Sequence, residues 1–395
     1  MSPITRSIWV LSLVSLFTDM ASDMLYPVMP AYLRSIGFSV AFIGLLEGIA
    51  EAAAGLSKGY FGYWSDMSGK RLPFVRMGYA LSALSKPLLA AMPYPLWVFC
   101  VRTMDRLGKG MRTGARDAIL ADASTHENRG KVFGFHRSMD TVGAAIGPAL
   151  ALIWLYFRPG DYVPLFFIAF LPGVVSVLLL FTLKDQNGKP KEAKAIRFSD
   201  SIRWLKQAPL AYRRLLWGLL FFAAINSTEI FLLLRAKNSV GSDAAVVGLY
   251  IFYNLVFALL AYPLGRLSDK MGMKRIFLLG LGLFAVVYLG MAWLQTTTAM
   301  IALFALYGVF AAATDGLAKA WISKVCGHNE KAVGLGTFAG LQSLALLLAS
   351  VWAGFVWDAA GPVTVFIATA GLVLPVGLYI WLCTHENSDT TKPQP

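Results

Sequence analysis

Long apolar stretches separated by short polar segments run through the whole chain. A helix that crosses the hydrocarbon core of a bilayer needs about 20 mostly apolar residues. The pattern therefore predicts an all-α membrane protein with twelve transmembrane helices, near residues 8–33, 40–63, 74–93, 96–120, 132–156, 162–183, 213–235, 244–265, 274–295, 298–322, 332–357 and 362–383.

The longest polar stretch lies in the middle of the chain and divides the twelve spans into two sets of six. We expect an N-terminal six-helix bundle at residues 1–184 and a C-terminal six-helix bundle at 213–384. Between them, residues 185–212 form a cytoplasmic loop in which the segment near 201–210 suits an amphipathic surface helix. Residues 385–395 form a cytoplasmic tail.

The distribution of Lys and Arg predicts the orientation. With the N-terminus inside the cell, most of the 35 basic residues lie in inner loops and tails. The outer loops then hold only Arg34, Arg158, Arg235 and Lys237. We expect a multi-pass protein of the cell (inner) membrane with both termini in the cytoplasm.

Composition narrows the class of protein further. Hydrophobic residues make up 57% of the chain and charged residues 14%, against about 25% charged in a soluble domain. The net charge of +13 comes from residues scattered between apolar runs, so no nucleic-acid partner is expected. The three cysteines are far apart, which predicts neither disulfides nor a metal site.

A loop pattern occurs twice, at the inner end of the second helix of each half. The two copies are 203 residues apart and share Gly, Asp, Gly and a basic pair. Such a repeat is typical of transporters whose site lies between two halves of the protein. The first copy contains Gly62, Asp66, Gly69, Lys70 and Arg71, and the second contains Gly265, Asp269, Gly272, Lys274 and Arg275.

These two loops resemble the signature loop of the major facilitator superfamily, and the resemblance covers nearly the whole chain. It implies two pseudo-symmetric six-helix bundles that alternate access to a central site. In the fifth span, Gly134, Gly143 and Gly147-Pro148 resemble the motif of that superfamily's proton-driven exporters, although Ala151 and Leu152 stand where the family has a Gly pair. The stretch 105–117 resembles a bacterial branch of the family.

We interpret the repeated loops as gating elements. A carboxylate at Asp66 can pair with basic groups and with a helix N-terminus, and so hold the two halves in one state. Asp66, Arg71, Asp269 and Arg275 should therefore affect turnover rather than substrate identity. Gly143, Gly147 and Pro148 should let the fifth helix pack closely and bend.

Charged residues within the spans are concentrated in the first half. A charge at the centre of a membrane helix costs about 2.5–3.5 kcal/mol, so it usually faces a cavity or a partner. Helix-neighbour spacing predicts the ion pairs Arg102–Asp105, Asp105–Lys109, Arg137–Asp140 and Asp315–Lys319.

Arg102, Arg106, Lys109 and Arg112 nevertheless form one basic stripe with Asp105 alongside, and this stripe could bind an anionic group of a substrate. The predicted substrate-binding residues are Arg102, Arg106, Lys109, Asp23, Tyr26, Glu229 and Asn226.

Proton coupling is predicted from acidic residues that can gain and lose a basic partner. Burial raises the pKa of a carboxyl group and a nearby cation lowers it, so an exchange of partners binds or releases a proton. The predicted coupling residues are Asp19, Asp23, Glu47, Glu51, Arg137 and Asp140. The lone histidine within a span, His136, fits a local hydrogen-bond partner better than a relay.

The sequence therefore predicts a proton-coupled antiporter that exports a small organic solute, which could bear an anionic group. One alternative is proton-coupled uptake or exchange of an organic anion, and a lower-ranked one is translocation of a lipid or amphiphile. The chain lacks an ATP-binding motif and a catalytic or metal-ligating set at membrane depth, so we expect no enzyme activity and no cofactor. The expected partners are the substrate, protons and the lipid bilayer, and the protein is expected to be monomeric.

Overall fold

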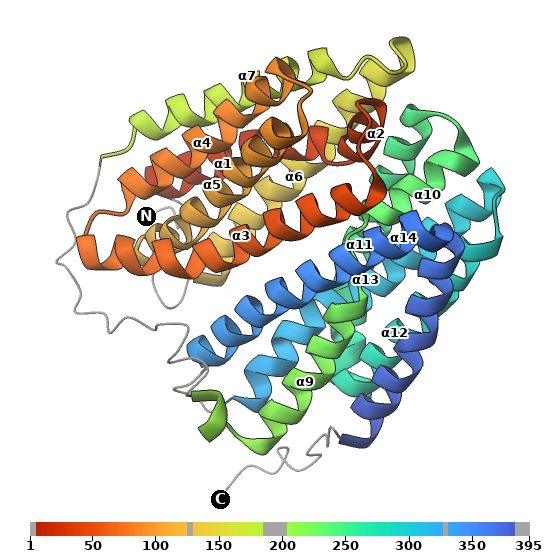
Figure 1. Ribbon diagram of the computed structural model, residues 1–395. Helices are drawn as coiled ribbons and strands as arrows, with labels where there is room; N and C mark the ends of the chain where they lie inside the picture. The colour runs from red at the N-terminus through yellow and green to blue at the C-terminus, as the bar shows by residue number, and fades with distance from the viewer. Residues whose placement is uncertain (1–4, 125–128, 185–203, 327–330, 384–395) are drawn as a thin grey trace, which may run out of the picture. The chain divides into compact units, whose positions relative to one another are not determined.

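The computed structural model describes residues 5–124, 129–184, 204–326 and 331–383, and every regular element in these ranges is a helix (Figure 1). The chain divides into two compact units. Unit 1 comprises Met1–Ala195 and Thr228–Ile251, and unit 2 comprises Ile196–Ser227 and Phe252–Pro395.

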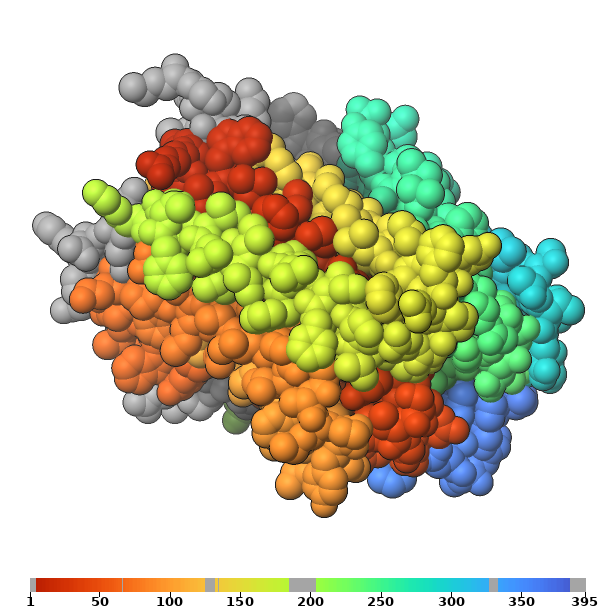
Figure 2. Space-filling view, turned by 90° about the horizontal axis from the view of Figure 1, so that it is seen from above, coloured from red at the N-terminus to blue at the C-terminus, as the bar shows by residue number. Residues whose placement is uncertain are grey.

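Unit 1 contains the helices of the N-terminal half and a short part of the C-terminal half. Helix α1 packs against α6 and α7, and α5 packs against α3 and α4. Figure 2 shows α7, in yellow-green, lying along α1, in red. The helices are α1 (Arg6–Leu25), α2 (Met29–Ser35), α3 (Val40–Ser68), α4 (Leu72–Ala91), α5 (Pro95–Asp122), α6 (Arg129–Phe157), α7 (Val163–Phe181), α10 (Ile230–Val240) and the start of α11 (Asp243–Met271).

Unit 2 has an aromatic core. Phe222 of α9 makes edge contacts with Phe284 of α12 and Phe310 of α13 at centroid distances of 5.3 and 6.0 Å. All nine buried Glu, Asp, Lys, Arg and His side chains of the described residues belong to unit 1. Unit 2 holds α9 (Leu210–Ile225), the rest of α11, α12 (Met273–Trp293), α13 (Thr297–Val325) and α14 (Lys331–Cys383).

The helices account for the twelve predicted spans. In the described part of the chain, nine helical segments are long and apolar enough to cross a membrane. Helices α4 and α5 are not among the nine, because their charged residues lower the mean hydropathy. Helix α14 contains two spans joined at Gly361, whose φ of 83° interrupts the helix. The protein is therefore an all-α membrane protein of twelve spans.

Two of the predicted spans are broken rather than continuous. The span predicted at 8–33 separates into α1 and α2, because Pro27 has no N–H to donate within a helix. The span predicted at 213–235 separates into α9 and α10 at residues 226–229, which begin with Asn, Ser and Thr, residue types that are disfavoured inside helices.

Apolar side chains cover the outer surface of the helices. On α7, Phe167, Leu171, Leu178 and Phe181 are each more than half exposed. A continuous apolar face of this kind fits contact with lipid. Most of the central loop, at 185–203, and the tail, at 384–395, lie outside the described residues, so the loop, its surface helix and the domain boundaries remain predictions.

Candidate functional site

Helices α3, α4 and α5 share a buried network of ion pairs. Glu47 of α3 is 1% exposed and accepts two hydrogen bonds from Arg102 of α5, at 2.9 Å from Nε and 3.1 Å from Nη2. Arg106, one turn further along α5, lies 3.1 Å from Glu51 and 3.9 Å from Glu47. Glu47 and Glu51 of α3 are thus both paired across the helix interface.

Asp105 lies at the other side of the same network. It accepts a hydrogen bond from Lys86 of α4 at 2.9 Å and another from Ser85 at 3.2 Å. Arg102 lies 3.6 Å from its second oxygen, as its helix spacing predicted. The expected pair of Asp105 with Lys109 is wrong, because Lys86 on the neighbouring helix occupies that place.

Glycines bring the three helices close enough to form this network. A Cβ added at Gly110 of α5 would lie 1.8 Å from the Ser57 hydroxyl oxygen of α3. A Cβ added at Gly78 of α4 would lie 2.7 Å from the Gly108 carbonyl oxygen of α5. Side chains of any size at these positions would separate the helices and stretch the ion pairs.

Helix α1 carries two acidic residues in a different situation. Asp19 and Asp23 are half-buried, and neither makes a hydrogen bond or an ion pair with any residue that the structure describes. The basic residues nearest to them include Lys109 of α5. Lys109 itself is exposed and lies within 4 Å of no carboxylate in the described ranges. This group of three side chains is polar, accessible and not locked in pairs.

At the predicted cytoplasmic end of α6, His136 and Asp140 are 4% and 7% exposed. The His136 Nε2 atom lies 3.6 Å from Asp140 Oδ1, and Nδ1 lies 3.4 Å from the Ser12 hydroxyl of α1. Arg137 is 3.8 Å from Asp140 but its side chain is 78% exposed, so this predicted pair is weak.

The end of α1 contacts the residue that precedes α10, and both belong to unit 1. The Tyr26 hydroxyl, at the end of α1, donates a 2.8 Å hydrogen bond to Glu229 before α10. The guanidinium of Arg106 lies 6.0 Å from the Tyr26 ring, and Tyr250 lies 5.6 Å from it on another side. Three predicted substrate-binding residues, Tyr26, Arg106 and Glu229, are therefore close together.

Asn226 belongs to unit 2 and begins the second break. Its side-chain oxygen is buried and accepts no hydrogen bond from the described residues. Broken membrane helices expose backbone and side-chain polar groups, and they mark binding sites in many transporters. The proline and the run of small polar residues were the sequence signals for both breaks.

A second polar cluster joins the ends of α7, α10 and α11 and was not predicted from the sequence. The Tyr162 hydroxyl donates to Asp243 at 2.6 Å, and Lys237 lies 2.6 Å from the other oxygen of Asp243. On the predicted topology this cluster lies at the outer face, where residues 158–162 and 237–243 form the loops.

The first copy of the repeated loop forms a tight turn between α3 and α4. Gly69 has a φ of 65°, which only glycine adopts easily. Arg71 pairs with Asp122 of α5. A Cβ at Gly114 of α5 would lie 3.2 Å from the Gly62 Cα, so α3 and α5 touch here. Lys70 is exposed, and the side chain of Asp66 lies outside the described part of the structure.

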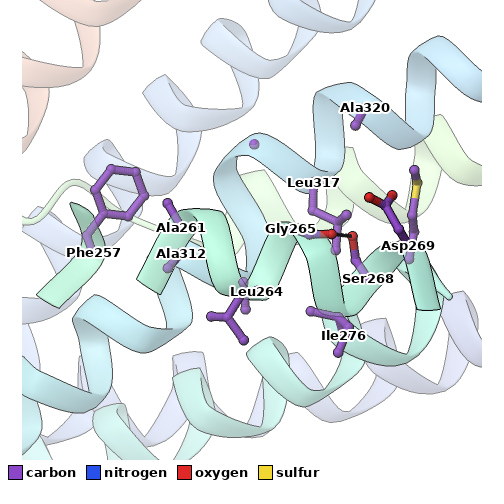
Figure 3. Close-up of a pocket in the computed structure, with 13 residues that line it drawn as sticks. Phe257, Ala261, Leu264, Gly265, Ser268, Asp269, Ile276, Ala312, Leu317 and Ala320 are labelled. Carbon is purple, nitrogen blue, oxygen red and sulfur yellow. Dashed lines mark hydrogen bonds between the residues drawn. The ribbon is translucent and has the colours of Figure 1, made fainter. Parts of the chain in front are cut away.

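The second copy is more open. Gly272 has a φ of 94°, and Arg275 is exposed. Gly265 and Asp269 line a cavity of about 300 Å³ between α11 and α13 (Figure 3). Asp269 pairs with no residue in the described ranges. At the first copy of the pattern the helices α3 and α5 are in contact, whereas at the second copy a cavity separates α11 from α13.

The exporter-like motif of α6 packs against α1. A Cβ at Gly143 would lie 2.2 Å from the Leu16 carbonyl oxygen, and one at Gly147 would lie 2.3 Å from the Met20 carbonyl oxygen. Pro148 follows within the same helix. The close approach expected of this motif thus occurs within unit 1, beside Asp19 and Asp23.

No group of three or more metal-ligating side chains occurs among the described residues.

Comparison with known proteins agrees with this architecture. The sequence profile of the Major Facilitator Superfamily matches residues 11–250 and 215–395. The uncharacterized MFS-type transporter MJ1317 of Methanocaldococcus jannaschii is 30% identical over 383 residues, covering 95% of this chain and 94% of the relative. The multidrug resistance protein MdtG of Salmonella paratyphi A is 23% identical, with 95% of each chain covered.

Solved structures show the same fold. The nucleoside transporter NupG superposes with a TM-score of 0.79 at 14% identity, covering 96% of this chain and 99% of its own. The human organic anion transporter MFSD10 gives a TM-score of 0.67 at 20% identity, with 96% and 100% covered. At these identities the likeness concerns the fold alone. Together with the profile match, these findings show that the chain belongs to the Major Facilitator Superfamily and is a multi-pass secondary transporter.

Proposed function

We propose that this transporter is a proton-coupled antiporter that exports a small organic solute across the cell membrane, with both termini in the cytoplasm. One observation carries the proposal. Asp19 and Asp23 have no ion pair or hydrogen bond among the described residues, although they lie on a transmembrane helix beside a network in which the other acids are paired.

We assign a structural role to the acidic residues that have ion-pair partners and a coupling role to those that have none. Glu47 and Asp105 are buried with basic partners at 2.9 Å, so protonating either would leave a buried cation uncompensated. Asp19 and Asp23 can take up a proton without breaking an ion pair. A substrate that enters beside them displaces the proton, and this competition couples the two fluxes in opposite directions.

The substrate would bind in unit 1, beside the end of α1 and the residue that precedes α10. There Tyr26 offers an aromatic face and Glu229 an acceptor. Asn226 belongs to unit 2 and stays a predicted substrate-binding residue, with an amide oxygen that accepts no hydrogen bond from the described residues.

Glu47 and Glu51 neutralise Arg102 and Arg106 of the basic stripe. Arg112 is 4% exposed and donates a hydrogen bond to Ser82, whereas Lys109 is exposed. An anionic group on the substrate would therefore bind Lys109.

Export rather than uptake is supported by two features. The glycines of α6 match an exporter-like motif and pack against α1, the helix that carries Asp19 and Asp23. The name of one relative, MdtG, refers to multidrug resistance. The name of another refers to efflux, the multi-drug resistance efflux pump PmrA homolog of Lactococcus lactis, which is 22% identical over 74% of this chain. The repeated loops would gate this cycle, through Asp66 and Arg71 in the first copy and Asp269 and Arg275 in the second.

The test uses purified protein in liposomes that contain the pH indicator pyranine. A panel of organic cations, anions and neutral compounds is added, and movement of protons is recorded for each. We expect at least one compound to move protons in the direction opposite to its own transport. Asp23→Asn should abolish this signal, because an amide cannot bind and release a proton.

The matched control is Asp161→Asn, a change of the same chemistry in the loop between α6 and α7. It should leave the signal unchanged. Proton movement in the same direction as an organic anion would instead support the alternative of uptake. A response to amphiphiles alone, without proton movement, would favour lipid translocation and contradict the proposal.

A further inference from the structure

The proposed cycle uses Asp19 and Asp23 and gives no step to the buried His136–Asp140 pair of α6, although Asp140 is among the coupling residues predicted from the sequence. Both His136 Nε2 and Asp140 Oδ1 are buried, and neither has a hydrogen-bond partner in the described part of the chain. The two atoms are 3.6 Å apart. Buried polar atoms are nearly always satisfied, so two adjacent exceptions indicate a functional role or a water between them.

This pair lies against a continuous polar face of α1. The face runs about 21 Å, at 1.5 Å per residue. Ser12 contacts His136 at one end, and Tyr26 contacts Glu229 at the other. We call this the polar face of α1, and its residues are Ser12, Ser15, Asp19, Ser22, Asp23 and Tyr26.

The packing of α6 on α1 places the pair next to the coupling acids. The helices run in parallel, because Gly143 meets Leu16 and Gly147, four residues further, meets Met20. Gly143 and Gly147, which follow Asp140 along α6, present no side chain to α1. Asp140 is thus the last titratable group that α6 presents to this face, and Asp19 is among its charged neighbours.

Other charged groups also face the pair. On α5, Arg116 donates a 3.0 Å hydrogen bond to Ser15 of α1 and a 2.9 Å bond to Asp117. On α6, Arg137 adds an exposed positive charge. Around Asp19, the basic residues of α5 are Lys109, Arg112 and Arg116. The pair thus faces cations on α5 and on its own helix, together with the carboxylate of Asp117.

We propose that His136 and Asp140 form the cytoplasmic exit for the proton that Asp19 and Asp23 carry. This inference rests on the proposed antiport. The Asp19 carboxylic acid gives its proton, through water, to the Asp140 carboxylate. Asp140 passes it to the lone pair of His136 Nε2, which makes an imidazolium. The imidazolium loses a proton to cytoplasmic water, and both acids end ionised and His136 neutral.

The first test needs no substrate. The other histidines, His126, His328 and His385, lie outside the described residues, and replacing them with Gln leaves His136 as the only histidine. Its ¹⁵N imidazole signals are then followed by NMR during a pH titration. We expect Asp140→Asn and Asp19→Asn each to move the midpoint by at least about half a pH unit. Asp161→Asn should not move it, and an unchanged midpoint in both variants would overturn the inference.

The second test uses the panel compound with the largest proton signal in liposomes. His136→Asn should slow proton-driven transport at least about tenfold, as loss of a proton-transfer group does. Exchange of labelled for unlabelled compound needs no net proton release, so it should keep its rate. Added imidazole should restore the driven transport.

The two proposals fail in different ways. If His136→Asn slows exchange and proton-driven transport equally and imidazole restores neither, His136 has only a structural role. The proton exit is then refuted, and the antiport proposal is not. If the wild-type protein moves the compound without protons, the antiport proposal itself fails, and the exit fails with it.

Discussion

The Glu47–Arg102 pair allows a quantitative test of the buried network. Glu47 is 1% exposed and Arg102 is 4% exposed, and two hydrogen bonds join them at 2.9 and 3.1 Å. Removing one partner of a buried pair leaves the other charge uncompensated, at a cost of about 3–5 kcal/mol. Glu47→Gln and Arg102→Met should each destabilise the fold by about this amount.

The double variant should be much less destabilised than the sum of the two single variants. Replacing both members of a buried pair removes the uncompensated charge, and such replacements are often close to neutral. The expected coupling energy is therefore at least about 2 kcal/mol, within the range found for residues in direct contact.

The assay is thermal unfolding of the purified protein in detergent. A loss of about 3 kcal/mol lowers Tm by at least about 6 °C for a unit of this size. The control is Lys58→Met, since Lys58 is 52% exposed and lies 3.9 Å from Asp117. Exposed pairs contribute about 0–1 kcal/mol, so Tm should barely change. The reasoning is refuted if the decrease in Tm of the double variant equals the sum of the two single decreases. It is also refuted if a single variant loses as little Tm as Lys58→Met.

Two further predictions concern helix contacts. Gly143→Ala should lower Tm and the rate of transport, because the added Cβ would lie 2.2 Å from the backbone oxygen of Leu16. The control is Gly316→Ala, whose added Cβ would have no atom within 4 Å, and this variant should melt like the wild type. Tyr26→Phe removes the 2.8 Å hydrogen bond to Glu229, worth about 1.5–3 kcal/mol for a charged acceptor. Pulsed EPR between labels on α2 and α10 should then show a larger separated population, and an unchanged distance distribution would mean that this hydrogen bond does not hold the two helices together.

Periodicity predicted the number of helices and the faces on which charges lie. The spacing of Arg102, Asp105 and Arg106 placed them on one side of α5, and the pair Arg102–Asp105 follows from that spacing alone. Partners on other helices, such as Lys86 for Asp105, depend on how α4 packs on α5. A pattern along one helix contains no information about the rotation of its neighbour.

The helix breaks and the His136 pair show a second limit. A window of apolar residues reads as one span even where Pro27 divides it, because hydropathy averages over the break. His136 looked like an isolated histidine in the sequence. Its contact with Ser12, 124 residues away, arises only when α6 lies along α1.

The charges of α5 also have a consequence for biogenesis. Arg102, Asp105, Arg106, Lys109 and Arg112 each oppose insertion by up to about 2.5–3.5 kcal/mol at the helix centre, so α5 cannot leave the translocon on its own hydrophobicity. Its partners Glu47 and Lys86 are synthesised earlier, on α3 and α4. We therefore expect the nascent chain to hold these two helices beside the translocon until α5 arrives, so that the three enter the lipid together.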